Sequence, residues 1–176
     1  MAGLTLAGIP QLSQGAETKA AADEVFMMFP GDYTWSEAVR AAIGSSIGGG
    51  GEIGEIYRVC AALKGRSGDN AAWFEEWNKM GEKVALLAEQ AKEKGYLETA
   101  PRPPYMRGAH YIQIGERLRQ PRTPEAQKAY ARSIELFKKG LPDVPFLSVD
   151  RVEIPFEGGK SLPAYFVRKR GTAAVK

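Results

Sequence analysis

Hydrophobic residues recur at steps of three and four along most of the chain, and this spacing places them on one face of a helix. The most regular stripe begins after Asp69, a favourable N-cap, and comprises Trp73, Trp77, Met80, Val84, Leu87 and Ala91. Lys92 and Lys94 follow, with Gly95 just beyond them, which is the arrangement that favours a helix C-terminus. The pattern therefore predicts one long amphipathic helix between Asp69 and Gly95.

Several other segments share this periodicity and carry helix-end signals. Thr34-Trp35-Ser36-Glu37 matches the capping box of a helix that should end near Gly44. Thr123-Pro124-Glu125 supplies the N-cap, the first-turn proline and the first-turn acid of a helix that should run to about Lys139. Further helices are expected at about residues 18–29, 53–64 and 105–118, and the glycines at 48–51 are interpreted as a hinge between two of the helices.

The period changes near the end of the chain, where Val152–Phe156, Gly158-Gly159 and Leu162–Arg168 read as strand, turn and strand. Two strands alone are marginal in water, so we expect this hairpin to open a larger sheet whose remainder is not in the sequence. The predicted fold class is mainly α, with five to six helices in residues 1–145 and a β-hairpin that begins a larger sheet in residues 146–176.

Composition limits this picture without deciding it. At 176 residues and 44% hydrophobic content, the chain is long and apolar enough to bury a core. Its formal charge of +3 comes from interleaved acids and bases, without the concentrated basic stripe of a nucleic-acid-binding protein. The short apolar run at residues 4–9 is neither a secretory signal nor a membrane span, so we expect a cytoplasmic protein that binds no membrane and no nucleic acid.

Cysteine and histidine are too few for most metal or disulfide chemistry. The single cysteine, Cys60, excludes an internal disulfide and is interpreted as a small buried hydrophobe, and the single histidine makes a metal site improbable. No cofactor is expected. Trp73 and Trp77, one helical turn apart, are interpreted as core residues rather than as a stacking platform for a ligand.

Gly44-Ser45-Ser46-Ile47-Gly48 formally matches the nucleophile elbow G-x-S-x-G. The elbow needs a strand that enters a strained turn and then a helix, whereas these residues follow a helix and lead into further glycines. A triad of Ser46 with Asp69 and His110 can be written from the order of the residues, but we assign no catalytic residue to this chain.

His110 lies one helical turn from Arg107 and next to Tyr111, and two interpretations remain open. In the first, it is a partly packed, hydrogen-bonded residue on a helix face. In the second, the polar tips of Arg107, His110 and Tyr111 border a pocket and bind a ligand.

An ordered series of segments resembles one group of α/β-hydrolases: those with an N-terminal helical cap, related to dihydroxypseudooxynicotine hydrolase and to fungal hydrolases that shorten naphthopyrone-type polyketides. The resemblance covers roughly Phe26 to Arg168. It is carried by residues 48–55, 68–77, 107–111, 152–158 and 163–166.

The resemblance implies a serine hydrolase whose helical cap, here residues 1–145, precedes the sheet and closes over the active site. Residues 146–176 would be the first hairpin of a truncated α/β-hydrolase domain, and such enzymes often cleave a carbon–carbon bond beside a ketone. The resemblance also implies substrate-binding roles for Arg107, His110 and Tyr111, a small aromatic or polyketide-like substrate, and a homodimer. The family's triad lies downstream of the hairpin, so the catalytic domain would be a partner in the same or a separate chain. The alternative is an autonomous helical interaction or dimerisation module without catalysis.

Overall fold

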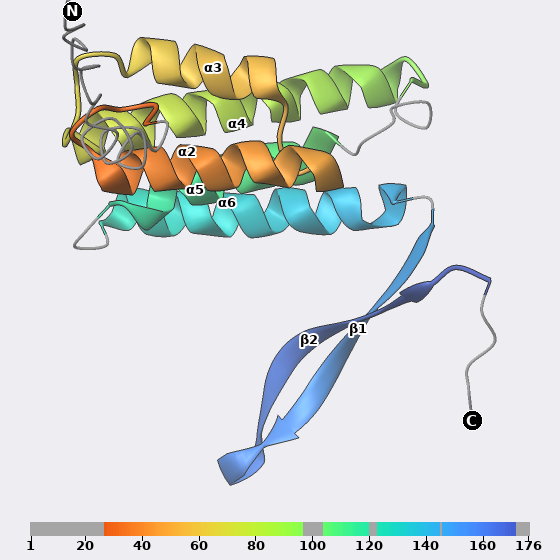
Figure 1. The fold of residues 1–176 in the computed structure, drawn as a ribbon. Helices are drawn as coiled ribbons and strands as arrows, with labels where there is room; N and C mark the ends of the chain where they lie inside the picture. Colours follow the sequence, from red (N-terminus) through yellow and green to blue (C-terminus); the bar gives the residue numbers. More distant parts are fainter. Residues whose placement is uncertain (1–26, 97–103, 120–122, 145, 172–176) are drawn as a thin grey trace, which may run out of the picture.

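The computed structural model describes residues 27–96, 104–119, 123–144 and 146–171. Within these ranges, helices are followed by two paired strands (Figure 1). The bounds are α2 (Tyr33–Ser45), α3 (Ile53–Ala62), α4 (Asn70–Glu93), α5 (Pro104–Arg117), α6 (Pro124–Gly140), β1 (Leu147–Phe156) and β2 (Lys160–Lys169). The prediction of a mainly helical chain that ends in a hairpin is confirmed. The helix expected at residues 18–29 lies almost wholly outside the described residues.

Capping side chains begin the helices, although not always the expected ones. The Asp69 carboxylate accepts a hydrogen bond from the Ala72 amide at 2.9 Å, so the predicted start of α4 is confirmed. The capping box at Thr34 was wrong, because Asp32 accepts the bond from the Trp35 amide at 2.9 Å and Thr34 lies inside α2. Aspartate is one of the strongest N-caps, and this one also accepts a bond from the Gly68 amide at 3.1 Å.

Buried side chains form two clusters. In the larger one, the Trp35 and Trp73 rings lie 4.8 Å apart and the Trp73 and Trp77 rings 5.5 Å apart. Trp73 and Trp77 are 0% exposed, which confirms their interpretation as core residues. The smaller cluster joins α4, α5 and α6 and comprises Ala85, Ala88, Tyr105, Ala109, Ile112 and Leu136.

Glycines allow α4 and α5 to cross closely. A Cβ atom on Gly81 would lie 2.5 Å from Ile112 Cγ1 and 2.8 Å from the Gly108 carbonyl oxygen. A Cβ atom on Gly108 would lie 2.9 Å from the Gly81 carbonyl oxygen. Because real Cβ atoms do not approach other atoms so closely, this contact requires glycine on both helices.

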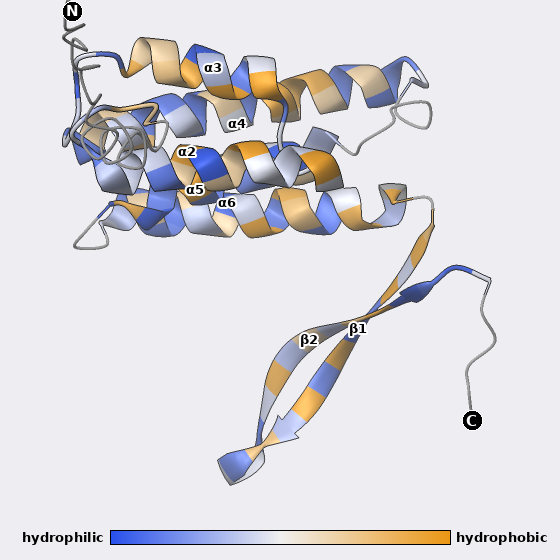
Figure 2. Ribbon diagram, viewed as in Figure 1, coloured by the Kyte–Doolittle hydropathy of each residue, from blue (hydrophilic) through white to orange (hydrophobic). Residues whose placement is uncertain are grey.

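The hairpin pairs β1 with β2 in antiparallel register, from Leu147 opposite Lys169 to Phe156 opposite Lys160. The first strand begins earlier than the predicted Val152, and the Gly158-Gly159 turn is present with positive φ at both glycines. Figure 1 shows the hairpin extending away from the helices beyond the end of α6, and Figure 2 shows hydrophobic and hydrophilic residues alternating along it.

One face of the hairpin is apolar and exposed to solvent. Strand alternation and the register place Val152, Ile154, Phe156, Leu162 and Phe166 on that face. Their exposed fractions range from 38% for Val152 to 57% for Phe166. The opposite face touches the helices, since the Tyr165 ring lies 5.5 Å from the Phe137 ring of α6.

None of the helices in the described ranges combines the length and the apolar character that crossing a membrane requires.

Candidate functional site

The glycine-rich segment between α2 and α3 is packed. A single 3-10 turn, Ser46–Gly48, follows α2, and Gly49 then adopts φ +86°, which favours glycine. A Cβ atom on Gly51 would lie 2.9 Å from the Ala42 carbonyl oxygen. Rather than an open hinge, this segment is a fixed connection that presents backbone groups to α5.

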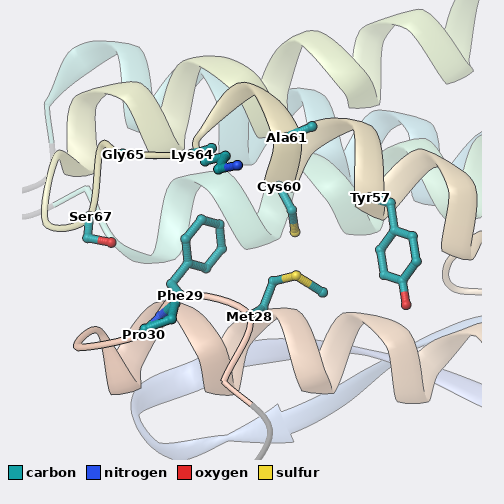
Figure 3. A pocket seen from close by; sticks show the side chains of 9 residues that line it. All are labelled: Met28, Phe29, Pro30, Tyr57, Cys60, Ala61, Lys64, Gly65 and Ser67. Carbon is teal, nitrogen blue, oxygen red and sulfur yellow. The ribbon is translucent and has the colours of Figure 1, made fainter.

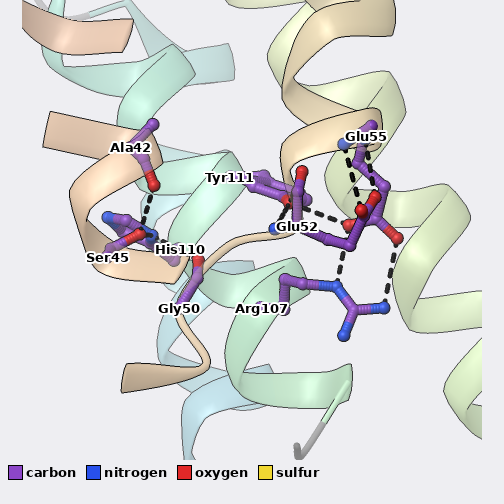
Figure 4. Close-up of polar contacts among 9 residues, drawn as sticks. Ala42, Ser45, Gly50, Glu52, Glu55, Arg107, His110 and Tyr111 are labelled. Atoms are coloured by element: carbon purple, nitrogen blue, oxygen red, sulfur yellow. Dashed lines mark hydrogen bonds and ion pairs between the residues drawn. The ribbon is translucent and has the colours of Figure 1, made fainter. Parts of the chain in front are cut away.

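A buried polar cluster joins the start of α3 to α5 (Figure 4). The Arg107 guanidinium donates two hydrogen bonds to the Glu55 carboxylate, at 2.7 and 3.1 Å, and these side chains are 17% and 11% exposed. The Tyr111 hydroxyl donates to Glu55 Oε2 at 2.8 Å and accepts from the Glu52 amide at 2.7 Å. Glu55 therefore connects Arg107 to Tyr111 through charge-assisted hydrogen bonds.

Electrostatics fix the protonation of two members of this region. The Glu52 carboxylate caps α3 by accepting bonds from the Gly54 and Glu55 amides at 3.0 and 2.8 Å, and these bonds lower its pKa. Burial, and then the hydrogen bond to Glu55, raise the pKa of the Tyr111 phenol. Tyr111 therefore stays neutral at physiological pH and does not act as a base.

His110 lies on a different side of α5 from this cluster. Its Nδ1 atom lies 2.6 Å from the Gly50 carbonyl oxygen and 3.4 Å from Ser45 Oγ. Because a carbonyl oxygen only accepts, Nδ1 carries the hydrogen, and in the neutral ring Nε2 keeps its lone pair. Within the described ranges, no hydrogen bond involves Nε2, so this atom can accept one from a ligand.

The three residues predicted to bind substrate therefore belong to two separate sets of contacts. Arg107 and Tyr111 meet through Glu55, whereas His110 contacts the glycine-rich segment. We expected the polar groups of all three side chains to be available to a ligand. The structure differs for Tyr111, which is 0% exposed. His110 is half-buried and hydrogen-bonded, as the first of its two interpretations expects. Binding of substrate stays a prediction.

Sequence reasoning missed Glu55, although a signal for it existed. Glu55 falls in the same helical stripe as Ile56 and Val59, where an acid is costly unless a cation pairs with it. Nothing in the sequence indicated that the Gly50 carbonyl oxygen would contact His110, because the folded path of the glycine-rich segment alone brings the two together.

Other candidate groups do not form a reactive site. Ser46 is 7% exposed and lies in a 3-10 turn after a helix, and no strand precedes it in the described part of the chain. The nucleophile elbow therefore lacks its structural context. Cys60 is 7% exposed and burial raises the pKa of its thiol to about 11, which confirms its interpretation as a buried hydrophobe. Among the described residues, no three His, Cys, Asp or Glu side chains are grouped to hold a metal.

Comparison with known proteins finds no matching family model, but it finds related fungal proteins. Hydrolase ORFZ of Pyricularia oryzae is 32% identical over 143 residues, which are 77% of this chain and 32% of the relative. Hydrolase acrC of Aspergillus aculeatus is 29% identical over 85% of this chain and 35% of the relative. Alpha/beta hydrolase xenA of Xenoacremonium sinensis is 30% identical over 78% of this chain and 31% of the relative. The chain thus spans about a third of the length of these relatives.

Proposed function

Because the chain is related in sequence to fungal hydrolases, among them proteins named alpha/beta hydrolases, we propose that it forms the helical cap of such an enzyme. Its hairpin contributes the first two strands of the catalytic sheet. The catalytic serine, acid and histidine come from residues outside this sequence. The reaction is hydrolysis of an ester or of a carbon–carbon bond beside a ketone, in an aromatic or polyketide-like substrate.

The observation that carries this proposal is the apolar hairpin face. Five large side chains form an exposed row on one face of the hairpin: Val152, Ile154, Phe156, Leu162 and Phe166. Two strands with an uncovered apolar face do not form a stable sheet alone. Further strands and helices of a catalytic domain would cover this face and pair the free edges of the hairpin.

Within that enzyme, α5 borders the substrate cleft. His110 accepts a hydrogen bond from the substrate at Nε2, while its Nδ1 stays on Gly50. Arg107 and Tyr111 act mainly by holding the start of α3 through Glu55, which keeps the glycine segment and His110 in place. The subunits pair as a homodimer.

The test is to determine the transcript beyond codon 176 and to assay the protein that it encodes. We expect an in-frame strand followed by a G-x-S-x-G elbow, and hydrolysis of an aryl ester or ketone that is lost when the elbow serine is replaced by alanine. In that protein, His110→Ala should lower kcat/KM by about one to two orders of magnitude and lower the unfolding midpoint only slightly. A stop codon directly after codon 176, with no separate chain that binds this one and supplies the catalytic serine, would contradict the proposal.

A second candidate is an autonomous helical module that pairs with other chains. It is favoured by the two buried clusters, which give the helices a core of their own. Under this alternative, the chain alone melts cooperatively and does not bind hydrophobic dyes at the hairpin. Aggregation of the isolated chain through the hairpin would support the cap instead.

A further inference from the structure

A cavity of about 580 Å³ lies between α3 and the segment that leads into α2 (Figure 3). It shares no residue with the polar cluster on α5. Its lining residues are Met28, Phe29, Pro30, Tyr57, Cys60, Ala61, Lys64, Gly65 and Ser67. This volume is typical of sites that bind small molecules.

One wall of the cavity is held rigidly by contacts behind it. The Phe29 ring packs edge-to-face on Trp35 at 5.1 Å, and Trp35 is 1% exposed. The Phe29 backbone is fixed as well, because its amide donates to Ser36 Oγ at 3.1 Å and its carbonyl accepts from the same hydroxyl at 3.1 Å. The Phe29 side chain is thus kept at the wall of the cavity.

The turn between α3 and α4 closes one end of the cavity and is also anchored. Gly65 adopts φ +77°, and the Gly68 amide donates to Asp32 Oδ2 at 3.1 Å. The other oxygen of Asp32 caps α2. Both the turn and the segment before α2 are therefore fixed to the same carboxylate, and the cavity is formed before any ligand binds.

The chemistry of the lining is apolar with one cation. Figure 3 shows Met28 and Phe29 directed from one side towards α3, which carries Cys60, with Lys64 above the Phe29 ring in this view. Among the residues that the structure describes, no acidic side chain lines the cavity. Within the described ranges, no ion pair joins Lys64 to a carboxylate, whereas Arg107, Arg132 and Lys139 each have such a partner.

We propose that this cavity binds a small aromatic molecule that carries one negative charge. The aromatic part lies against Phe29, Met28 and Cys60, where methionine sulfur and ring edges favour a flat partner. The anionic group lies at Lys64, the one charged side chain among the described residues of the lining. This site is independent of the proposed hydrolase function.

Two fluorescent probes test the proposal with the full chain: anilinonaphthalene sulfonate, an aromatic anion, and phenylnaphthylamine, its uncharged counterpart. Lys64→Met should weaken binding of the anion about three- to ten-fold and leave binding of the uncharged probe unchanged. Ala61→Trp should abolish binding of both probes, because the indole fills the cavity from an exposed helix position.

Matched controls separate this site from the apolar hairpin face, which can bind the same dyes. Lys128→Met removes an exposed lysine on α6, and Ala62→Trp places the same indole at the neighbouring residue, outside the lining. Neither control should change binding of either probe. Circular dichroism should show that all four variants keep their helical content.

Three results would overturn the proposal. If Ala61→Trp leaves binding of both probes intact, the probes bind elsewhere. If Lys64→Met weakens both probes equally, the lysine does not select an anion. If the probes bind only after residues 1–26 are deleted, or if Ala61→Trp splits a dimer, the cavity is covered by protein and is not a ligand site.

Discussion

At the scale of single residues, the hydrogen bonds of the Tyr111 hydroxyl can be tested by one substitution. It joins the Glu55 carboxylate to the Glu52 amide in a buried position. Tyr111→Phe removes the hydroxyl and leaves both groups short of a partner, so the free energy of unfolding should fall by about 1–3 kcal/mol. Urea denaturation measures this fall. Tyr57→Phe is the control, because Tyr57 is 51% exposed and should change stability by less than about 0.5 kcal/mol. Equal effects of the two changes would contradict the contact.

The lowered pKa of Glu52 predicts that the stability of the fold depends on pH. Its pKa is lowered in the folded chain, so its charged form stabilises the fold above the ordinary pKa of 4.5, and this contribution is lost as pH falls through the lower, folded value. Glu52→Gln should therefore be less stable than the parent at pH 7, by under about 1 kcal/mol because the carboxylate is exposed to solvent. Thermal melts between pH 7 and about pH 3 should show this difference shrinking. A difference that is constant with pH would show that the cap does not depend on charge.

At the scale of elements, the crossing of α4 and α5 depends on glycine. Gly81→Ala would bring a Cβ atom within 2.5 Å of Ile112 Cγ1, so α4 and α5 must separate and the free energy of unfolding should fall by about 1–3 kcal/mol. Gly44→Ala in α2 is the matched control, because nothing lies within 4 Å of its Cβ position. Alanine there should stabilise the chain by about 0.4–1 kcal/mol. Denaturant unfolding of both variants gives the comparison, and stabilisation by Gly81→Ala would disprove the close crossing.

Local signals predicted the elements well where one residue dominates an end. Asp69 and Thr123 began the helices that they were expected to cap, and Gly158-Gly159 formed the turn. The start of α2 was missed because Asp32 caps the helix two residues before Thr34, and sequence alone does not show that Asp32 is also held by the Gly68 amide. The candidate site was harder, since Glu55 meets Arg107 only after α3 and α5 have packed.

For the whole molecule, the helices and the hairpin should differ in stability. The hairpin keeps its apolar face in solvent, whereas Trp73, Trp77 and Val84 are at most 1% exposed. Hydrogen exchange should therefore be fast from Val152 to Arg168 and slow from Trp73 to Leu87 in the isolated chain. Slow exchange across both strands of a monomer would show that the helices already protect the hairpin, and the need for a covering domain would disappear.

The clustering of the tryptophans determines which part of the chain tryptophan fluorescence and near-ultraviolet circular dichroism report on. The chain has three tryptophans, and all of them belong to the larger core, in one run of neighbouring rings. Rings so close exchange excitation, so their emission and near-ultraviolet dichroism report on a single location. Loosening of β1 and β2 would leave that signal unchanged while the far-ultraviolet spectrum altered. A thermal melt followed by tryptophan fluorescence alone would thus report cooperative unfolding of the helices and would not detect unfolding of the hairpin.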